Sequence, residues 1–374
     1  MHILYDYQMF AIQRFGGISR IFIELMRELS KHPDCAIHWH RGLKTDDYDI
    51  SSFRSGLKRY FALNPFPYSQ EPWLKPKLNQ WTFQWFNWWL TKPYDIYHPT
   101  YYDAAPLDWV STKRLAVTIC DMIPEKLLAD QPKFQAVIQA KKTLVEQADI
   151  IFSISESTKR DLVELLQVNP DKVKVTPLAS RMTEISASLD MPLVAREKPY
   201  FLYVGTRSKY KNFNILVQAM ASSEWLKNNF QVICFGGSSE FLKSEVKYQI
   251  EHQVADNFTY LRGDDTLLKS LYQHAQALVY PSLYEGFGLP PLEAMSCGCP
   301  VVCSRTSSLP EVVGSAATFF EDLSSAEELA AAMTRVVTDS TYRQQSIQTG
   351  LVQSKAFSWQ QTADLTLIGY RSIL

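Results

Sequence analysis

The sequence predicts an α/β fold in which two doubly wound, parallel-sheet domains of similar size face a cleft. Three observations favour it. The chain has 374 residues, 46% of them hydrophobic, which is enough for two domains with separate cores. Short apolar runs alternate with amphipathic stretches, the order typical of parallel sheets covered by helices. This alternation stops in the polar segment 180–199 and then starts again.

The first half begins with a strand over residues 2–5, a loop through Gly16 and Gly17, and an amphipathic helix from about Ile18. The other elements predicted there are strands over residues 37–40, 96–97, 115–119 and 150–154, and a helix over residues 137–147. The second half is predicted to hold strands over residues 200–204, 231–235, 258–261, 277–280 and 301–302, with helices over residues 214–221 and 266–275. Ligands of such sheets bind beyond the carboxyl ends of the strands.

Composition excludes several classes of protein. The net charge is -1 and charged residues make up 21% of the chain, so nucleic acid is not the expected partner. No apolar run reaches the roughly 20 residues that span a bilayer, and the N-terminus does not read as a signal peptide. Six cysteines without such a signal favour a reducing cytoplasm. Cys297, Cys299 and Cys303 flank an apolar strand with no histidine nearby, so they are interpreted as core residues instead of metal ligands.

Residues 73–90 depart from the pattern because they are rich in tryptophan. Trp81, Trp85, Trp88 and Trp89 follow one another at spacings of four, three and one, with Phe83 and Phe86 between them, which predicts a helix with a wide aromatic face. One interpretation is a helix that packs on the first domain. The other is an interfacial surface or acceptor platform at a membrane, because indole rings suit membrane boundaries.

The stretch SLYEGFGLPPLEAMSCGCPVVCS, residues 282–304, reads as the end of a strand, a glycine loop, a short helix and another strand. Proline is favourable in the first turn of a helix and glycine just past its end, so Pro291 is predicted to open the helix and Gly298 to close it. Glu285 then lies in the loop and Glu293 in the first helical turn.

This arrangement has a chemical interpretation. Amides from Gly286 to Leu289 would form an anion site at the helix N-terminus. A carboxylate on either side of an anion suits a phosphate with a sugar at each end, that is, a nucleotide sugar. The alternative makes Glu293 a helix-dipole carboxylate and Glu285 a solvated loop residue. The spacing alone leaves both open.

Cations follow the first strand of the second half. Arg207 and Lys211 could neutralise a diphosphate, although a solvated basic loop would have the same composition. The Gly16-Gly17 turn could also approach a phosphate, but there is no G-x-G-x-x-G motif.

Together these motifs resemble glycosyltransferase family 4, the retaining GT-B enzymes. The resemblance rests on the two glutamates of 285–293 (EGFGLPPLE), on Val204-Gly205 followed by the cations, and on FGGISR at 15–20. It extends to LPEVVG at 309–314 and FSW at 357–359, so it covers nearly the whole chain. The chain looks most similar to mannosyltransferases that build O-antigen and related polysaccharides.

The resemblance implies roles for these residues. Glu285 would hold donor-sugar hydroxyls, and Glu293 the ribose hydroxyls. Lys211 and Arg207 would stabilise the departing diphosphate in place of a metal, joined by an amide of Gly17. The other implied donor-binding residues are Gly16, Gly286, Phe287, Gly288 and Leu289. Transfer would retain anomeric configuration by front-face attack, with the leaving phosphate accepting the acceptor proton.

One motif position departs from the family. Relatives carry His-Asp where this chain has Cys120-Asp121, and that histidine approaches the 6-hydroxyl of the donor sugar. A thiol replaces it poorly, so a 6-deoxy or pentose donor is one expectation and a contact from elsewhere is the other. Asp121 and His98 are acceptor-side candidates together with Cys120, although His98 also suits a structural role.

The resemblance also implies an organisation and partners. Residues 1–182 would form the acceptor domain, residues 183–355 the nucleotide-sugar domain, and residues 356–374 a helix returning to the first domain. The donor would be a nucleotide sugar such as GDP-mannose, the acceptor a glycan or lipid-linked glycan, and no metal or other cofactor would be needed. The enzyme would be cytoplasmic, with residues 73–90 as a contact to the inner face of the membrane.

Three other assignments compete with this one. A non-hydrolysing nucleotide-sugar epimerase shares the two-domain architecture, but it needs no acceptor. A metal-dependent transferase of GT-A type would use an Asp-x-Asp such as Asp47-Tyr48-Asp49, which here lies in a polar stretch. A non-catalytic scaffold would lose the cations, whereas Arg207 and Lys211 are both present.

Overall fold

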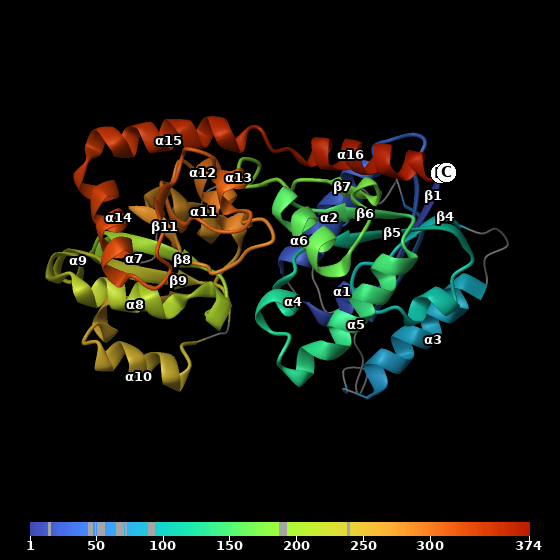
Figure 1. Ribbon diagram of the computed structural model, residues 1–374, viewed down its shortest axis with the longest axis horizontal. Helices are drawn as coiled ribbons and strands as arrows, with labels where there is room; N and C mark the ends of the chain where they lie inside the picture. Colours follow the sequence, from blue (N-terminus) through green and yellow to red (C-terminus); the bar gives the residue numbers. More distant parts are fainter. Residues whose placement is uncertain are drawn as a thin grey trace. The chain divides into compact units, whose positions relative to one another are not determined.

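The computed structural model describes residues 1–13, 16–43, 48, 50, 57–64, 71, 73–88, 94–186, 193–237 and 240–374. It divides into two compact units (Figure 1). Unit 1 comprises Met1–Leu178 and Trp359–Leu374, and unit 2 comprises Ala179–Ser358. The prediction of two doubly wound, parallel-sheet domains is confirmed.

Unit 1 is built on a seven-stranded sheet in the order β3-β2-β1-β4-β5-β6-β7, with every neighbouring pair parallel. Its strands are β1 (His2–Tyr5), β2 (Ala36–Leu43), β3 (Leu57–Leu63), β4 (Tyr94–His98), β5 (Thr112–Ile119), β6 (Ile150–Ser153) and β7 (Val173–Val175). Sequence reasoning missed β3 and β7. The first is a half-exposed edge strand that carries two cations, and the second has only three residues, so neither shows a buried apolar run.

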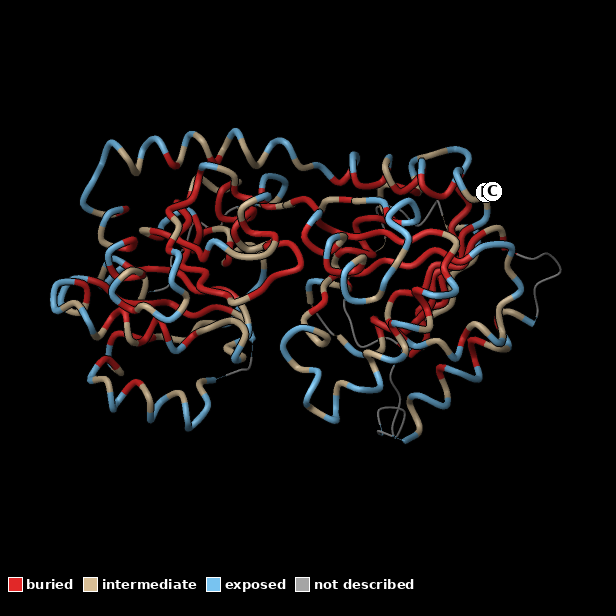
Figure 2. Tube along the Cα trace, in the orientation of Figure 1, coloured by how far each residue is buried: buried red, intermediate tan, exposed pale blue. Residues whose placement is uncertain are grey.

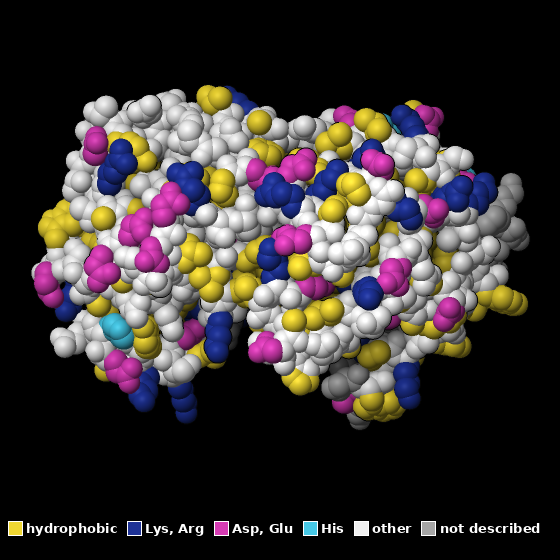
Figure 3. Space-filling view, viewed as in Figure 1, with side chains coloured by type: hydrophobic (Ala, Val, Ile, Leu, Met, Phe, Trp, Pro, Cys, Tyr) yellow, Lys and Arg dark blue, Asp and Glu magenta, His cyan; other side chains and the backbone are white. Residues whose placement is uncertain are grey.

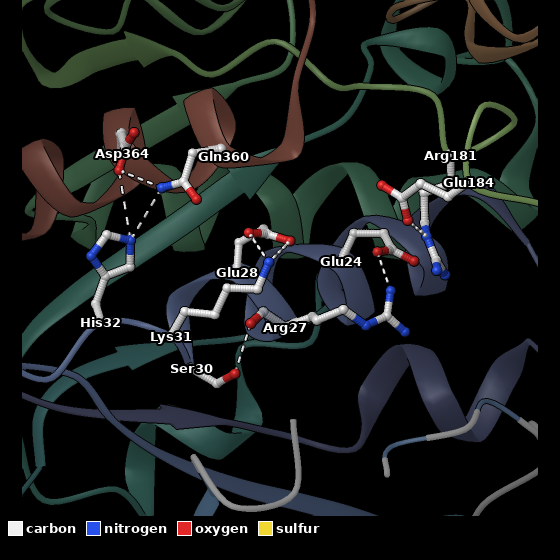
Figure 4. Close-up of polar contacts among 10 residues, drawn as sticks. All are labelled: Glu24, Arg27, Glu28, Ser30, Lys31, His32, Arg181, Glu184, Gln360 and Asp364. Atoms are coloured by element: carbon white, nitrogen blue, oxygen red, sulfur yellow. Dashed lines mark hydrogen bonds and ion pairs between the residues drawn. The ribbon is translucent and has the colours of Figure 1, made fainter. Parts of the chain in front are cut away.

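The helices of unit 1 include one from the far end of the chain. They are α1 (Gln8–Ile12), α2 (Gly17–Leu29), α3 (Leu74–Trp88), α4 (Ile123–Leu127), α5 (Pro132–Gln147), α6 (Glu156–Leu166) and α16 (Trp359–Ser372). Helix α16 packs against α2, β6 and β7. The hydroxyls of Tyr5 and Tyr370 lie 2.8 Å apart in the core. At the surface, His32 Nε2 lies 3.6 Å from Asp364 Oδ1, and Glu28 of α2 pairs with Lys31, which lies just past the end of the helix (Figure 4).

Unit 2 repeats the architecture with six parallel strands in the order β10-β9-β8-β11-β12-β13. They are β8 (Tyr200–Val204), β9 (Gln231–Phe235), β10 (Phe258–Leu261), β11 (Ala277–Tyr280), β12 (Val301–Ser304) and β13 (Thr318–Phe320). The first five match the predicted strands, and the three-residue β13 was missed. The strand order reverses between β8 and β11, and open sheets of this kind bind ligands beside such a reversal.

The helices of unit 2 are α7 (Leu193–Glu197), α8 (Phe213–Ser222), α9 (Glu224–Asn229), α10 (Lys243–Glu251), α11 (Asp265–His274), α12 (Leu289–Ser296), α13 (Leu309–Val313), α14 (Ala326–Thr338) and α15 (Ser340–Ser354). Helix α7 lies in the segment 180–199 that was predicted to be irregular. In both units the central strands are largely buried and the outer helices carry many of the exposed residues (Figure 2).

The tryptophan-rich helix α3 turns its phenylalanines inward and its tryptophans outward. Phe83 and Phe86 are buried and make edge contacts with His40. Trp81, Trp85 and Trp88 are 67%, 47% and 79% exposed. The helix therefore packs on unit 1 through one face and leaves an indole face open. Residues 89 and 90 of the predicted helix lie outside the described residues.

The face drawn in Figure 3 shows no large patch of a single charge. Lys and Arg side chains alternate with Asp and Glu over the face drawn in Figure 3, in keeping with the net charge of -1. Among the residues that the structure describes, no helix is both long and apolar enough to cross a membrane.

Candidate active site

The candidate site of unit 2 lies at the carboxyl ends of β8 and β11, the strands between which the strand order reverses. The loop after β8 carries Lys211 and the loop after β11 carries Glu285. The amide of Leu283 donates a hydrogen bond to the carbonyl of Tyr210 at 2.7 Å, so the two loops touch through their backbones. This is the position at which sheets of this topology bind ligands.

Lys211 and Glu285 form an ion pair in which Nζ lies 2.7 Å from Oε1. The Lys211 ammonium also donates to the hydroxyl of Tyr280 at 2.8 Å and lies over the Tyr280 ring. Burial by itself lowers the pKa of Lys211, but the Glu285 carboxylate and the hydroxyls of Tyr280 and Tyr210 raise it well above its usual value. Lys211 therefore remains a cation, and the structure pairs it directly with Glu285. Tyr280, the last residue of β11, was not anticipated.

The loop after Glu285 leads directly into α12. Gly288 has φ +109°, in the region that favours glycine, and a side chain there would meet Leu309 at 2.8 Å. The sequence predicted a start at Pro291, but the helix begins at Leu289. Both prolines fit inside it because proline is tolerated throughout the first turn. No side chain caps this end of the helix.

The anion-binding donors at this helix end are few. Pro290 and Pro291 have no N–H, so the amides of Gly288, the N-cap, and Leu289, the first helical residue, are the donors that this helix end offers. The Phe287 ring is buried and packs edge-on against Phe357, 5.7 Å between ring centroids. These contacts hold the amides at one place on a fixed loop, next to Gly286.

Glu293 lies within α12 and is 6% exposed. Because the helix starts at Leu289, Glu293 opens the second turn instead of lying in the first. Its Oε2 accepts a hydrogen bond from the hydroxyl of Tyr272 at 3.1 Å, and Tyr272 belongs to the neighbouring α11. Burial and the Glu293 carboxylate raise the pKa of Tyr272, so this phenol stays a donor. Nothing in the sequence pattern identified Tyr272 as the partner of Glu293.

Arg207 is not brought next to Glu285. Its guanidinium Nε lies 2.9 Å from Glu245 Oε2 of α10, and a second guanidinium nitrogen donates to the carbonyl of Glu240 at 2.7 Å. The group also lies over the rings of Phe241 and Tyr260. The Arg207 side chain is 1% exposed. The structure thus pairs the two predicted cations with different carboxylates, and Arg207 fastens α10 to the loop after β8.

In unit 1, Gly16 and Gly17 lie at the start of α2, as the sequence predicts. Gly16 is the N-cap, and its backbone lies near the hydroxyl of Tyr48, which is also 3.1 Å from Ser19 Oγ. A Cβ placed on Gly17 would meet no atom within 4 Å. The first turn of α2 is thus open at Gly17. Phe15 of the FGGISR motif lies outside the described residues.

Cys120 and Asp121 follow β5 in unit 1. Cys120 is 5% exposed, and its amide donates to the hydroxyl of Tyr102 at 3.0 Å. Burial raises the pKa of the Cys120 thiol to about 12, so the thiol is neutral. Asp121 is half-buried, and its Oδ1 accepts from the amide of Ile123. The Asp121 carbonyl accepts from the buried ammonium of Lys141.

His98 lies in the core of unit 1, which corrects its assignment as an acceptor-side candidate. It is 0% exposed, with Nδ1 at 2.5 Å from the Tyr370 hydroxyl and Nε2 at 2.8 Å from Thr118 Oγ1. Burial lowers the pKa of His98 to about 3, so the ring is neutral. Both ring nitrogens are used in joining β4, β5 and α16, and the structural alternative holds.

The residues that would bind metal in the competing reading cannot be placed, since Asp47 and Asp49 lie outside the described residues. Within the described part of the chain, no cluster of three His, Cys, Asp or Glu side chains is arranged to hold a metal ion. Cys299 and Cys303 are buried free thiols, and Cys297 is a half-buried one, as the core interpretation predicts.

The comparisons with known proteins agree with this geometry. Residues 190–351, which lie within unit 2, match the family model "Glycosyl transferases group 1". The chain is 32% identical to the O-antigen chain mannosyltransferase B of Escherichia coli over 235 residues, 61% of each chain. It is 29% identical over 292 residues to the serotype-specific mannosyltransferase WbdA of Escherichia coli, covering 74% of this chain and 35% of that one. The chain therefore spans less than two thirds of the length of these relatives.

Solved structures show the GT-B fold along the whole chain. Sucrose-phosphate synthase of Thermosynechococcus elongatus superposes with a TM-score of 0.77 at 21% identity, covering 99% of this chain and 98% of the other. WaaG, a glycosyltransferase involved in lipopolysaccharide biosynthesis, superposes with a TM-score of 0.70 at 14% identity, covering 97% and 98%. At these identities the likeness establishes the fold.

Proposed function

We propose, from the match of residues 190–351 to the glycosyl transferases group 1 model, that the chain is a retaining glycosyltransferase. It would move a sugar from a nucleoside diphosphate sugar to a glycan or lipid-linked acceptor in polysaccharide biosynthesis. The observation that carries the proposal is the Lys211–Glu285 pair at the carboxyl ends of β8 and β11. In it a cation and a carboxylate lie side by side, and the carboxylate belongs to the loop that leads into α12.

Each group has a distinct task in this reaction. Lys211 neutralises the charge that develops on the departing diphosphate, and the amides of Phe287 to Leu289 contribute their dipoles. Glu285 accepts hydrogen bonds from donor-sugar hydroxyls, and Glu293 from the ribose. The leaving phosphate takes the acceptor proton, so no protein base is assigned. In unit 1, the amides of Gly16 and Gly17 are the proposed further contact of the diphosphate.

The proposed donor is GDP-mannose or a related sugar. The names of the relatives, which are O-antigen mannosyltransferases, support mannose. Cys120 supports a sugar without a 6-hydroxyl, because a neutral thiol offers only weak hydrogen bonding at the position where the family carries histidine. Asp121 is the acceptor-side carboxylate of the proposal.

We assign no metal to the reaction, because Lys211 supplies a positive charge where a divalent cation would otherwise stand. Transfer measured in excess EDTA is expected to equal transfer in buffer without EDTA. Complete loss of activity that magnesium or manganese restores would contradict this part of the proposal.

Ligand-dependent melting tests the proposed function directly. A cognate donor at 100 times its Kd stabilises the folded protein by about 2.7 kcal/mol, which gives a measurable rise in melting temperature. GDP-, UDP- and dTDP-sugars are compared, and the stabilising donor is then incubated with and without a lipid-linked glycan. Sugar transfer to the glycan supports the proposal. Conversion of the donor without any acceptor would instead indicate the epimerase, and stabilisation by no nucleotide sugar would reject both.

We also propose that the exposed indole face of α3 contacts the inner face of the cytoplasmic membrane, where a lipid-linked acceptor would reside. Trp81, Trp85 and Trp88 lie on one side of a helix that contains no acidic residue, and indole rings partition to the membrane interface. Flotation with phosphatidylglycerol vesicles should recover the wild type. Replacing these three tryptophans with serine should abolish recovery.

The matched control for this experiment is Trp225→Ser. Trp225 is 43% exposed in α9 of unit 2, so it removes an exposed indole that lies outside α3. Equal loss of vesicle binding in the control and in the triple variant would contradict the assignment to α3.

A further inference from the structure

The loop that carries Glu285 is fastened by side-chain hydroxyls from the segment that follows β12. Four of the five residues in this segment, residues 304–308, carry a hydroxyl, and each of these hydroxyls bonds to the backbone of residues 282–287. The contacts are Ser304 Oγ to the Ser282 carbonyl at 2.5 Å, Thr306 Oγ1 to the Leu283 carbonyl at 3.2 Å, Ser307 Oγ to the Glu285 amide at 2.8 Å, and Ser308 Oγ to the carbonyls of Glu285 at 2.9 Å and Phe287 at 2.8 Å.

Ser307 and Ser308 hold both peptide groups of Glu285. The Ser307 hydroxyl accepts from the Glu285 amide, and the Ser308 hydroxyl shares its hydrogen between the carbonyls of Glu285 and Phe287. Glu285 lies between β11 and α12, so neither a strand ladder nor a helix supplies these bonds. The hydroxyls of Ser307 and Ser308 therefore satisfy the backbone amide and carbonyl of Glu285, as a strand ladder or a helix does for residues inside secondary structure.

Residue 307 is a serine although its backbone conformation favours glycine. Ser307 has φ +48°, in the left-handed region where a residue with a Cβ is strained by about 1 kcal/mol and glycine is not. Glycine would relieve the strain but would lose the hydroxyl that receives the Glu285 amide. Ser308 is 0% exposed, so its hydroxyl has no water to replace the loop carbonyls.

A carboxylate acts well only when its backbone is held in place. Catalytic groups must keep within about 0.5 Å of the productive geometry, and a supporting layer of hydrogen bonds provides that precision. The Glu285 side chain points to Lys211 from a loop, and the orientation of that loop is set by the hydroxyls of residues 307 and 308.

We propose that Ser307 and Ser308 are positioning residues, which hold the backbone of Glu285 so that its carboxylate meets the donor sugar beside Lys211. The proposal rests on the proposed function of the site. Neither serine touches the donor in it. Both act through Glu285.

The test compares Ser308→Ala and Ser307→Gly with wild type, using GDP-mannose as donor and GDP as the binding probe. Because the turnover step depends on the placement of Glu285, kcat should fall about tenfold in each variant, within the range of one lost buried hydrogen bond. GDP affinity by calorimetry should change less than about twofold, since GDP lacks the sugar that Glu285 holds. Ser308→Thr keeps the hydroxyl and should restore most of kcat.

Ser270→Ala is the matched control. Ser270 is also 0% exposed in unit 2, and its hydroxyl bonds to Thr266 of its own helix α11. It should lower the melting temperature about as much as Ser308→Ala and leave kcat near wild type. If kcat falls equally in the control, or if Ser307→Gly and Ser308→Ala keep wild-type kcat, the positioning role is refuted. Ser307→Gly remains informative if Ser308→Ala does not fold, because glycine suits the backbone at 307.

Hydrogen exchange separates this proposal from the proposed function. The amides of residues 283–288 should exchange faster in both variants and at the wild-type rate in Ser270→Ala. If the wild type transfers no sugar from any nucleotide sugar, the proposed function fails, while faster exchange still supports the fastening of the loop. Unchanged exchange in both variants overturns the inference whatever the activity.

Discussion

The ammonium of Lys211 lies 2.7 Å from the carboxylate of Glu285, although 74 residues separate them in the chain. The pair forms because the strands that precede the two loops, β8 and β11, are neighbours in the sheet. It joins the group proposed for the diphosphate to the group proposed for the sugar.

The two glutamates of the motif should have separable effects. Glu285→Gln is expected mainly to lower kcat, because its contact with the sugar is made during transfer. Glu293→Gln is expected mainly to weaken nucleoside diphosphate binding. Each loses a charged hydrogen bond worth about 1.5–3 kcal/mol. Calorimetry with GDP decides the question, with the exposed Glu321→Gln as control. Equal weakening by Glu285→Gln and Glu293→Gln would show that the division of roles is wrong.

The Arg207–Glu245 pair should contribute to the stability of unit 2 more than to the binding of GDP. Arg207→Ala leaves Glu245 partly buried without its guanidinium, and breaking such a pair costs about 3–5 kcal/mol. The double variant with Glu245→Ala should be less destabilised than the sum of the two single variants, as urea unfolding would show. GDP affinity should stay within about twofold of wild type in Arg207→Ala and fall at least tenfold in Lys211→Ala. A tenfold loss in Arg207→Ala would return Arg207 to the diphosphate site.

Cys120 should influence the choice of donor sugar. Cys120→His adds a hydrogen-bonding ring and should shift the kcat/KM ratio of GDP-mannose to GDP-rhamnose toward mannose. One neutral hydrogen bond of about 1 kcal/mol corresponds to roughly fivefold. Using one nucleotide cancels recognition of the base. A wild-type preference of several hundredfold for mannose would make Cys120 a packing residue, as its 5% exposure also permits.

Unit 1 should lose stability in mild acid. Burial lowers the pKa of His40 and His98 to about 3 and that of His38 to about 4, against 6.5 for an ordinary histidine. The unfolded chain therefore binds more protons than the folded one. The stability is complete above about pH 6.5 and falls as the pH drops toward 4, by up to about 1.4 kcal/mol per pH unit for each histidine.

Urea unfolding followed by tryptophan fluorescence measures this loss in unit 1, because eight of the nine tryptophans, all but Trp225, belong to its sequence. In His98→Asn, unfolding of unit 1 should take up one proton fewer, so its free energy of unfolding should change less steeply with pH. An unchanged slope in His98→Asn would show that His98 is already protonated in the folded state.

Local features of the sequence determined most of the fold. Five of the six strands of unit 2 were predicted, because each is a short apolar run between polar turns, and periodicity along the chain reveals such runs. The glycine loop and the short helix after Glu285 were also predicted, since proline and glycine act on the backbone of their own residues. The sequence did not predict strands β3, β7 and β13. The first is a half-exposed edge strand and the other two have only three residues each, so none of them shows a recognisable apolar run.

Only the tertiary structure decided which side chains meet. It joined Lys211 to Glu285, turned Arg207 toward Glu245, placed His98 in the core and brought Ser307 and Ser308 under the Glu285 loop. The physical reason is the same in each case. Strand order determines which loops become neighbours, and within those neighbours a charged or polar side chain takes the partner that best offsets its loss of water. The spacing of residues along the chain determines neither which loops become neighbours nor which partner a side chain takes.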